Sequence, residues 1–259
     1  MNHSFWKPVD LVNAQITHRT IDKLRIWLRK NNDEIWFAFH HATDDEALTE
    51  EPPETAEWSR WILTAPTDSI ILEPVMPDNP MVILPEHPMH LSVDARIQFF
   101  TRIPLWVRLR TEAKKPETIT EIPIFQLSKT WFGSVTEGEL CYYSTTKARR
   151  ELSTDISRPY LINCPIWIEN ESDTPLHFEK FCFRVEFLTI YESDGEFWAD
   201  ETTISYQGED QISHVSMRGK LPKQLSSPLL RNKARKSLPG NLAKRTFQRI
   251  IDDFPFIHF

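Results

Sequence analysis

The fold is best read from the stretch Pro123-Ile-Phe-Gln-Leu-Ser-Lys-Thr-Trp-Phe-Gly-Ser-Val-Thr-Glu-Gly-Glu-Leu-Cys-Tyr-Tyr-Ser-Thr-Thr-Lys-Ala-Arg-Arg150. It contains two of the chain's six glycines and a dense group of aromatic residues. Trp131 stands two residues before Gly133, and Gly138 opens the strand-like run Glu139 to Tyr143. Glycine adopts backbone conformations that other residues avoid, so it favours tight turns. We therefore expect a corner here, at which the backbone folds closely against a core.

Alternating apolar residues on both sides of this stretch predict β-strands. Residues 23–30 and 34–40 alternate around the turn signal Asn31-Asn32-Asp33, which predicts a β-hairpin. The run from Leu176 to Tyr191 alternates in the same way and predicts a long strand pair, and Asp194-Gly195 predicts a further hairpin. Strands recur roughly every ten residues with turn signals between them, which is typical of an antiparallel all-β sandwich or barrel.

The predicted organisation has two β-rich halves and a tail. Residues 1–110 form the first half, with an exposed acidic loop at 41–57, and residues 122–217 form the second. The charged, proline-containing segment 111–121 is the expected boundary. A chain of 259 residues can hold one large sandwich or two fused smaller ones. The elements Ile103-Pro-Leu-Trp-Val107 and Cys164-Pro-Ile-Trp-Ile168 resemble each other, and two similar strand beginnings are favoured over a duplicated unit.

Composition excludes several classes of protein. With six glycines and nineteen prolines, the chain has no Walker-type or dinucleotide-binding fingerprint. Its three cysteines lack Cys-x-x-Cys spacing, which argues against a disulfide framework or a zinc ribbon. The nine histidines form no helical metal-binding motif, so neither a metal nor another cofactor is expected. Since no signal peptide and no apolar run long enough for a transmembrane segment occur, we expect a soluble, cytoplasmic protein.

Charge is distributed unevenly between the body and the tail. Residues 1–217 carry 20 basic and 35 acidic side chains, a net charge of −15. Residues 218–259 carry 10 basic and 2 acidic side chains, a net charge of +8. Asn241 is a suitable cap for a short basic helix from Leu242 to about Asp252, with Phe247 on its apolar face. The residues expected to make tail contacts are Arg231, Lys233, Arg235, Lys236, Lys244, Arg245 and Phe247.

Two motifs in the opening stretch resemble a known family. They are Leu127-Ser-Lys-Thr-Trp-Phe-Gly133 and Gly138-Glu-Leu-Cys-Tyr142, and the chain that contains them resembles the uncharacterised prokaryotic family known as domain of unknown function 432. Further matches are Val75-Met-Pro-Asp-Asn-Pro80, Gly195-Glu-Phe-Trp198 and the two proline–tryptophan elements, the second followed by Asn170. The resemblance spans roughly residues 58 to 217. It implies a shared fold, but it assigns no catalytic role to any residue.

The opening stretch also holds a candidate ligand pocket. Glu137 and Glu139 lie two apart, so both can point to one face of a strand, where paired carboxylates serve acid–base chemistry if one is desolvated. Solvated acids at a turn are the more common case, and Cys141 is expected to be a buried structural thiol. The basic residues nearby either bind an anionic ligand or pair with surplus acids. The candidate pocket residues are Trp131, Glu137, Glu139, Arg149 and Arg150.

Three functional hypotheses follow, and the sequence favours the first. It is a non-enzymatic binding or assembly module, whose basic tail docks on an acidic protein surface of the same chain, a partner protein or another subunit of a homo-oligomer. The second is a β-sandwich protein that binds or processes a small molecule or glycan near Trp131 and Glu139. The third is binding of nucleic-acid phosphates through the tail. The tail has no stacking aromatic residues between Arg218 and Arg245, which weakens this hypothesis.

Overall fold

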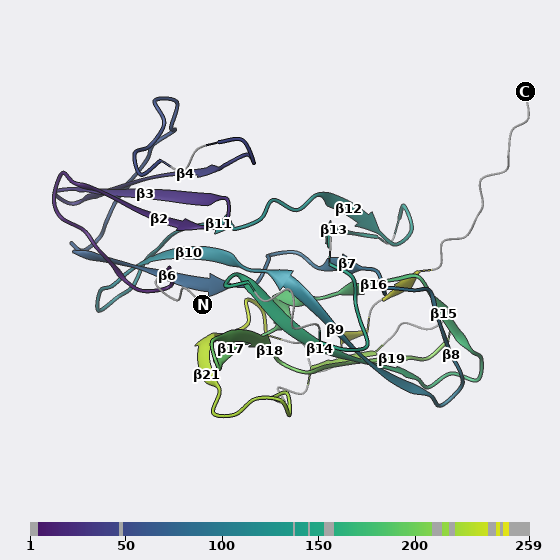
Figure 1. Cartoon of the computed structure of the whole chain (residues 1–259). Coiled ribbons are helices and arrows are strands. Elements are labelled where there is room, and N and C mark those ends of the chain that lie inside the picture. The colour runs from purple at the N-terminus through teal and green to yellow at the C-terminus, as the bar shows by residue number, and fades with distance from the viewer. Residues whose placement is uncertain are drawn as a thin grey trace, which may run out of the picture.

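The chain is built from β-strands, with no α-helix among the residues described. A computed structural model describes residues 5–46, 49–136, 138–144, 146–152, 158–208, 214–217, 221–237, 242–243 and 246–248 (Figure 1). A short 3-10 helix, η2 (Val185–Phe187), interrupts the strands. No helix in these ranges is long and apolar enough to cross a membrane. The prediction of an all-β fold is therefore confirmed for this part of the chain.

The N-terminal sheet has four antiparallel strands in the order β2-β3-β4-β5. They are β2 (Ile16–Ile21), β3 (Leu24–Asn31), β4 (Glu34–His41) and β5 (Ser59–Ile62). β3 and β4 form the predicted hairpin, in which Asn32 takes a positive φ of 56°, a conformation that asparagine tolerates. Apolar alternation decides which face of β3 meets the core, since the core side consists of Leu24, Ile26 and Leu28.

A second sheet lies beside the N-terminal sheet, with the order β1-β6-β10-β11 (Figure 1). Its strands are β1 (Val9–Asp10), β6 (Ser69–Val75), β10 (Trp106–Thr111) and β11 (Thr118–Pro123). The buried side chains of β6 and β10 belong to the same apolar cluster as those of β3; they are Ile70, Leu72, Val107 and Leu109. Burial of this shared surface holds the two sheets together.

Two further sheets and a strand pair complete the structure. One sheet has the order β12-β13-β7-β16-β23 and contains β12 (Lys129–Phe132), β13 (Glu139–Tyr143), β7 (Met81–Ile83), β16 (Lys180–Phe183) and β23 (Phe247–Gln248). The largest has the order β21-β17-β18-β14-β19-β20-β22, with β9 also paired to β14. It contains β9 (Arg96–Pro104), β14 (Leu161–Asn170), β17 (Ile190–Ser193), β18 (Glu196–Ala199), β19 (Thr202–Tyr206), β20 (His214–Met217), β21 (Leu229–Asn232) and β22 (Leu242–Ala243). The separate pair is β8 (Met89–Leu91) with β15 (Leu176–Phe178).

The two predicted halves share strand pairings and a core. β9, from the first half, runs antiparallel to β14, from the second, with Pro104 opposite Leu161 and Arg96 opposite Glu169. β10 also pairs with β11 across the expected boundary at 111–121. One buried apolar cluster contains residues from all five sheets. The halves therefore have no separate cores among the described residues.

The predicted C-terminal helix is wrong where the chain is described. Leu242–Ala243 and Phe247–Gln248 form the strands β22 and β23, and residues 249–252 lie outside the described residues. Phe247 pairs with Phe181 of β16, and its ring lies 5.2 Å from that of Phe178 and 5.7 Å from that of Tyr206, measured between centroids. Pairing with β16 places the phenylalanine ring against the core, and this tertiary contact overrides the helical pattern of the segment.

The expected long strand pair at 176–191 is interrupted. It is divided among β15, β16, η2 and the start of β17. Within β16 the residues on both faces are buried, including Phe181, Cys182 and Phe183. The alternation in the sequence therefore does not separate a core face from a solvent face, and it gives no signal of the turn at η2.

Asn170 links the end of β14 to two loops. This side chain is almost fully buried, with 1% exposed. Its Nδ2 lies within hydrogen-bond distance of the carbonyl oxygens of Leu91 (3.0 Å), Ser92 (3.1 Å) and Thr174 (2.9 Å). Its Oδ1 accepts hydrogen bonds from the backbone N–H (3.1 Å) and hydroxyl (2.7 Å) of Ser172. The amide thus satisfies several polar groups that water cannot reach.

We predict that Asn170→Ala lowers the free energy of unfolding by about 3 kcal/mol, because the buried carbonyl oxygen of Leu91 and the buried backbone N–H of Ser172 lose the amide as their partner. Urea denaturation followed by tryptophan fluorescence measures this loss. Asn13→Ala is the matched control, since Asn13 is exposed and accepts one hydrogen bond, from the backbone N–H of Asn32. The control should lose less than about 1 kcal/mol; an equal loss in both variants would contradict the role of Asn170.

Candidate functional site

The predicted corner is present in the β12–β13 hairpin. Trp131 is 52% exposed, and its indole Nε1 donates a hydrogen bond to the carbonyl oxygen of Ser134 at 2.8 Å. A Cβ atom at Gly138 would lie 2.0 Å from that Nε1, so no larger residue fits there without moving the indole. Gly133 has a φ of 110°, a conformation that strongly favours glycine. The tryptophan and the two glycines therefore define the turn.

Trp131 and Glu139 do not share a pocket. In the hairpin register Trp131 lies opposite Leu140, whereas Glu139 lies opposite Phe132. Side chains alternate between the two faces of a strand, so this register sends Trp131 and Glu139 to opposite faces. The predicted pocket is not formed by these two residues, and Glu137 lies outside the described residues.

Glu139 instead contacts Cys182 on β16 and Arg184, the residue that follows this strand. Its carboxylate forms an ion pair with Arg184, which is 2% exposed, and lies 3.7 Å from Sγ of Cys182. Sγ of Cys182 is 3.8 Å from Sγ of Cys141, and both thiols are buried and free. The hydrogen bond with Cys141, together with burial, raises the pKa of Cys182 well above its ordinary value. A protonated, enclosed thiol is a poor nucleophile, so this group is structural.

The two arginines of the predicted pocket lie elsewhere. Arg149 forms reciprocal backbone hydrogen bonds with Phe100, at 2.7 and 2.9 Å, and its Nε lies 3.4 Å from Oε1 of Glu86. Arg150 is exposed. No group of three or more metal-binding side chains occurs within the described ranges.

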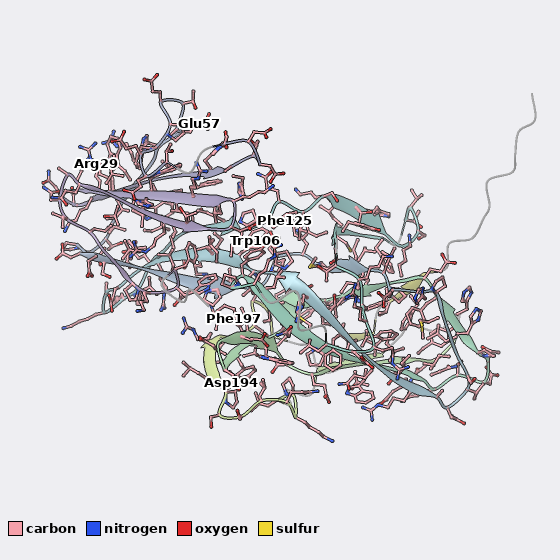
Figure 2. The ribbon with its side chains drawn as sticks, viewed as in Figure 1. Arg29, Glu57, Trp106, Phe125, Asp194 and Phe197 are labelled. Atoms are coloured by element: carbon pink, nitrogen blue, oxygen red, sulfur yellow. The ribbon has the colours of Figure 1, made fainter. Side chains whose placement is uncertain are left out.

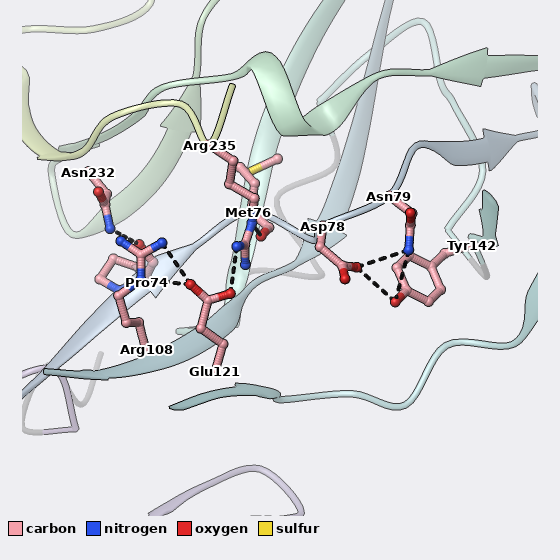
Figure 3. Close-up of polar contacts among 9 residues, drawn as sticks. All are labelled: Pro74, Met76, Asp78, Asn79, Arg108, Glu121, Tyr142, Asn232 and Arg235. Atoms are coloured by element: carbon pink, nitrogen blue, oxygen red, sulfur yellow. Dashed lines mark hydrogen bonds and ion pairs between the residues drawn. The ribbon is translucent and has the colours of Figure 1, made fainter. Parts of the chain in front are cut away.

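The basic tail contacts the acidic body of the same chain (Figure 3). Arg235 forms an ion pair with Glu121 at 2.5 Å, and its Nε donates a hydrogen bond to the carbonyl oxygen of Met76. The Arg235 guanidinium also lies 5.6 Å from the ring centroid of Trp106, in a cation–π contact. Glu121 is at the same time paired with Arg108, so one carboxylate joins the tail to β10. We refer to the contacts of Arg235 as the tail clasp.

The tail clasp lies next to a motif that carried the family resemblance. Asp78 accepts a hydrogen bond of 2.9 Å from the hydroxyl of Tyr142, while Asn232 of the tail donates one of 3.1 Å to the carbonyl oxygen of Pro74 (Figure 3). Burial raises the pKa of the Tyr142 phenol, and the hydrogen bond to Asp78 adds to this effect. The segment 74–80 therefore connects the opening stretch to the tail.

Two other cations of the tail pair with acids of the body. Arg231 Nη1 lies 3.0 Å from Oε2 of Glu192, and Lys236 Nζ lies 3.7 Å from Oε1 of Glu186. The backbone N–H of Lys236 also donates to the carbonyl oxygen of Glu186 at 3.0 Å. Lys233 is exposed. Of the other expected tail contacts, Phe247 packs as described above, and Lys244 and Arg245 lie outside the described residues.

A hollow of about 470 Å³ opens where the tail crosses the outer face of β9 and β14. The body lines it with Arg96, Gln98, Trp167 and Glu201, and the tail lines it with Leu221, Lys223 and Gln224. The Arg96 guanidinium lies 3.9 Å from the ring centroid of Trp167 and pairs with Glu169 at 2.8 Å. The volume of the hollow falls within the usual range for small-molecule sites. Sequence reasoning missed the hollow, although Trp167 belongs to one of the two proline–tryptophan elements.

Comparison with known proteins identifies the family. The family model described as "Protein of unknown function (DUF432)" matches residues 5–252. The chain belongs to this family. No curated protein and no solved structure matches this DUF432 chain. The match includes the acidic loop and most of the tail, which the sequence resemblance placed outside the family.

We predict that Arg235→Gln lowers the free energy of unfolding by about 2 kcal/mol, because it removes one partner of a largely enclosed ion pair. It should also speed proteolytic cleavage within residues 221–237. Urea denaturation and limited thermolysin digestion, followed by mass spectrometry, measure the two effects, since thermolysin does not require the Lys or Arg side chains that the variants remove. Lys233→Gln, two residues away on an exposed side chain, should change neither. Equal cleavage rates in both variants would show that the clasp does not hold the tail.

Glu186, which is 4% exposed, should make the stability of the fold depend on pH. Burial raises the pKa of this carboxyl above its ordinary value of 4.5, more than Lys236 and Arg184 lower it. The folded state therefore binds the proton more tightly than the unfolded state, and stability falls as the pH rises from the ordinary pKa through the folded-state pKa. Glu186→Gln removes this loss. Its stability relative to the wild type should increase as the pH rises above the ordinary carboxyl pKa of 4.5, measured in a series of urea denaturations; a difference independent of pH would contradict the assignment.

Proposed function

We propose that this protein is a non-catalytic, cytoplasmic binding module of the β-sandwich type. Its basic tail docks on the acidic surface of its own chain and there completes a site for a small polar ligand. The hollow beside Trp167 is the observation that carries the proposal, because three of its seven lining residues come from the tail and four from the body. The site therefore forms only when the tail is docked on the body.

The lining of the hollow suits a short saccharide. The side chains of Gln98 and Gln224 each offer N–H donors and a carbonyl acceptor, which complement sugar hydroxyls that both donate and accept. Glu201 adds an acceptor and Lys223 adds a donor. Trp167, whose ring the Arg96 guanidinium contacts at 3.9 Å, supplies an aromatic group for contacts with apolar C–H groups. This combination of an aromatic ring with a few polar groups is usual in small-molecule sites.

Docking of the tail on its own chain is favoured over docking on a partner subunit. Arg231, Arg235 and Lys236 each have an acidic partner within the chain. A partner subunit would have to displace these contacts, and the displaced acids would lose their cations. The glycan hypothesis is retained, but its pocket moves from Trp131 to Trp167.

The test is saturation-transfer difference NMR with maltotriose, cellotriose and tri-N-acetylchitotriose as probes. We expect at least one of them to bind, with a Kd of roughly 1 mM or lower. Trp167→Ala should weaken that binding by at least about tenfold, the equivalent of about 1.4 kcal/mol. Trp131→Ala is the matched control, since its exposed indole lies on a different sheet and should leave binding unchanged.

Two outcomes would contradict the proposal. Absence of a signal from all three probes with the wild-type protein would exclude a saccharide site of this affinity. Equal binding by wild-type protein and Trp167→Ala would exclude the hollow as the site. Arg235→Gln, which loosens the tail, should weaken binding as well; unchanged binding would show that the tail is not part of the site.

A further inference from the structure

The outer face of the N-terminal sheet carries an unusual group of cationic and aromatic side chains. Ile26 and Leu28 point into the core, so Arg25, Trp27 and Arg29 point away from it. The register places His40 opposite Arg25 and Trp36 opposite Arg29. We call these five residues the arginine–tryptophan face; they are Arg25, Trp27, Arg29, Trp36 and His40.

The described residues of the acidic loop, 41–46 and 49–57, cover part of this face. Its seven acidic residues are accompanied by no lysine or arginine, and one of them, Glu57, is labelled in Figure 2 together with Arg29 of β3. The indole Nε1 of Trp27 donates a hydrogen bond to the carbonyl oxygen of Glu50 at 2.8 Å, and Trp27 is 1% exposed. His40 Nε2 lies 2.8 Å from Oε2 of Glu46. The chain thus folds a negatively charged segment over this face.

Arg25 is poorly satisfied beneath this cover. The residue is 5% exposed, and its Nε and Nη2 atoms are buried without a hydrogen-bond partner among the described residues. Buried guanidinium groups normally bind carboxylates or phosphates through two parallel hydrogen bonds, so unpaired N–H groups are costly. The acidic loop supplies charge near Arg25 but not the oxygen atoms that its N–H groups require. An anion with suitably placed oxygen atoms would satisfy these N–H groups.

We propose that the arginine–tryptophan face binds single-stranded nucleic acid, and that the acidic loop occupies the face in its absence. Phosphate oxygens match the unpaired N–H groups of Arg25 and the charge of Arg29. Trp27, once the loop leaves it, and Trp36, whose ring the Arg60 guanidinium contacts at 4.7 Å, supply rings on which bases stack. Each such interaction is worth about 1–3 kcal/mol per base. An acidic peptide would use the cations but gain little from the rings, so the tryptophans favour nucleic acid. This inference is independent of the proposed saccharide site.

The test measures the fluorescence anisotropy of a fluorescein-labelled oligothymidylate of about 20 nucleotides with the full-length protein, at low salt. One variant neutralises the loop through Asp44→Asn, Asp45→Asn, Glu46→Gln and Glu50→Gln. The control neutralises four exposed acids elsewhere, through Glu112→Gln, Glu151→Gln, Glu171→Gln and Asp173→Asn. Both variants change the net charge equally, so they separate uncovering of the face from a general charge effect.

We expect the loop variant to bind at least about tenfold more tightly than both the wild type and the control. Adding Arg25→Gln to the loop variant should remove this gain, and Arg25→Lys should restore only part of it, because lysine lacks the planar fork. Circular dichroism confirms that each variant is folded.

Four results would overturn the proposal. The first is absence of binding by a folded loop variant. The second is an equal gain in the control, which would assign the effect to net charge. The third is equally strong competition by polyglutamate and by unlabelled oligothymidylate, which would assign the face to an acidic peptide. Loss of binding on Lys233→Gln with no effect of Arg25→Gln would likewise transfer nucleic-acid binding to the tail.

Discussion

The pairing of β9 with β14 is the constraint on which the rest of the structure depends. It joins residues 96–104 to residues 161–169. It also gives the largest sheet one face toward the core and one outer face. Ile97 and Phe99 of β9, with Ile166 and Ile168 of β14, belong to the common core. The alternating residues on the outer face include those that line the hollow. A shift of one residue in this register would move the core side chains outward and the polar ones inward, so the pairing fixes the core and the hollow together.

Local patterns predicted the local parts of the fold. The β3–β4 hairpin follows from alternation around Asn31-Asn32-Asp33, and the corner at Gly133 and Gly138 follows from glycines beside a large aromatic residue. The failures concern contacts between distant segments. Phe247 forms a strand because Phe181 lies opposite it, and no periodicity within the tail contains that information.

The candidate site was less predictable than the fold, for the same physical reason. The charge difference between body and tail is visible in the sequence and suggested docking. The individual partners are not visible, since Glu121 and Arg235 are separated by more than a hundred residues. Glu139 was considered for catalysis from its spacing to Glu137, but its partner is Arg184, which a single sequence does not connect to it. The hollow requires the crossing of the tail over Trp167, a tertiary feature.

At two places a segment of one charge lies over a surface of the opposite charge. The two places differ in how completely the enclosed polar groups find partners. In the tail clasp, Arg235 and Glu121 retain 14% and 21% side-chain exposure, and their ion pair is joined by a backbone hydrogen bond and a cation–π contact. Such a partly desolvated, multiply bonded group gains more than an exposed ion pair does. Over the arginine–tryptophan face, by contrast, Arg25 is enclosed while two of its nitrogen atoms lack partners within the described residues. Arg235 leaves only its Nη2 without a partner among the described residues, because Nη1 pairs with Glu121 and Nε with Met76. A cover that engages most of the donors beneath it stabilises one arrangement, whereas a cover that leaves two donors of one guanidinium unpaired can be displaced by an anion that pairs with them. The same electrostatic attraction therefore gives a fixed contact at the tail and an exchangeable one at the acidic loop.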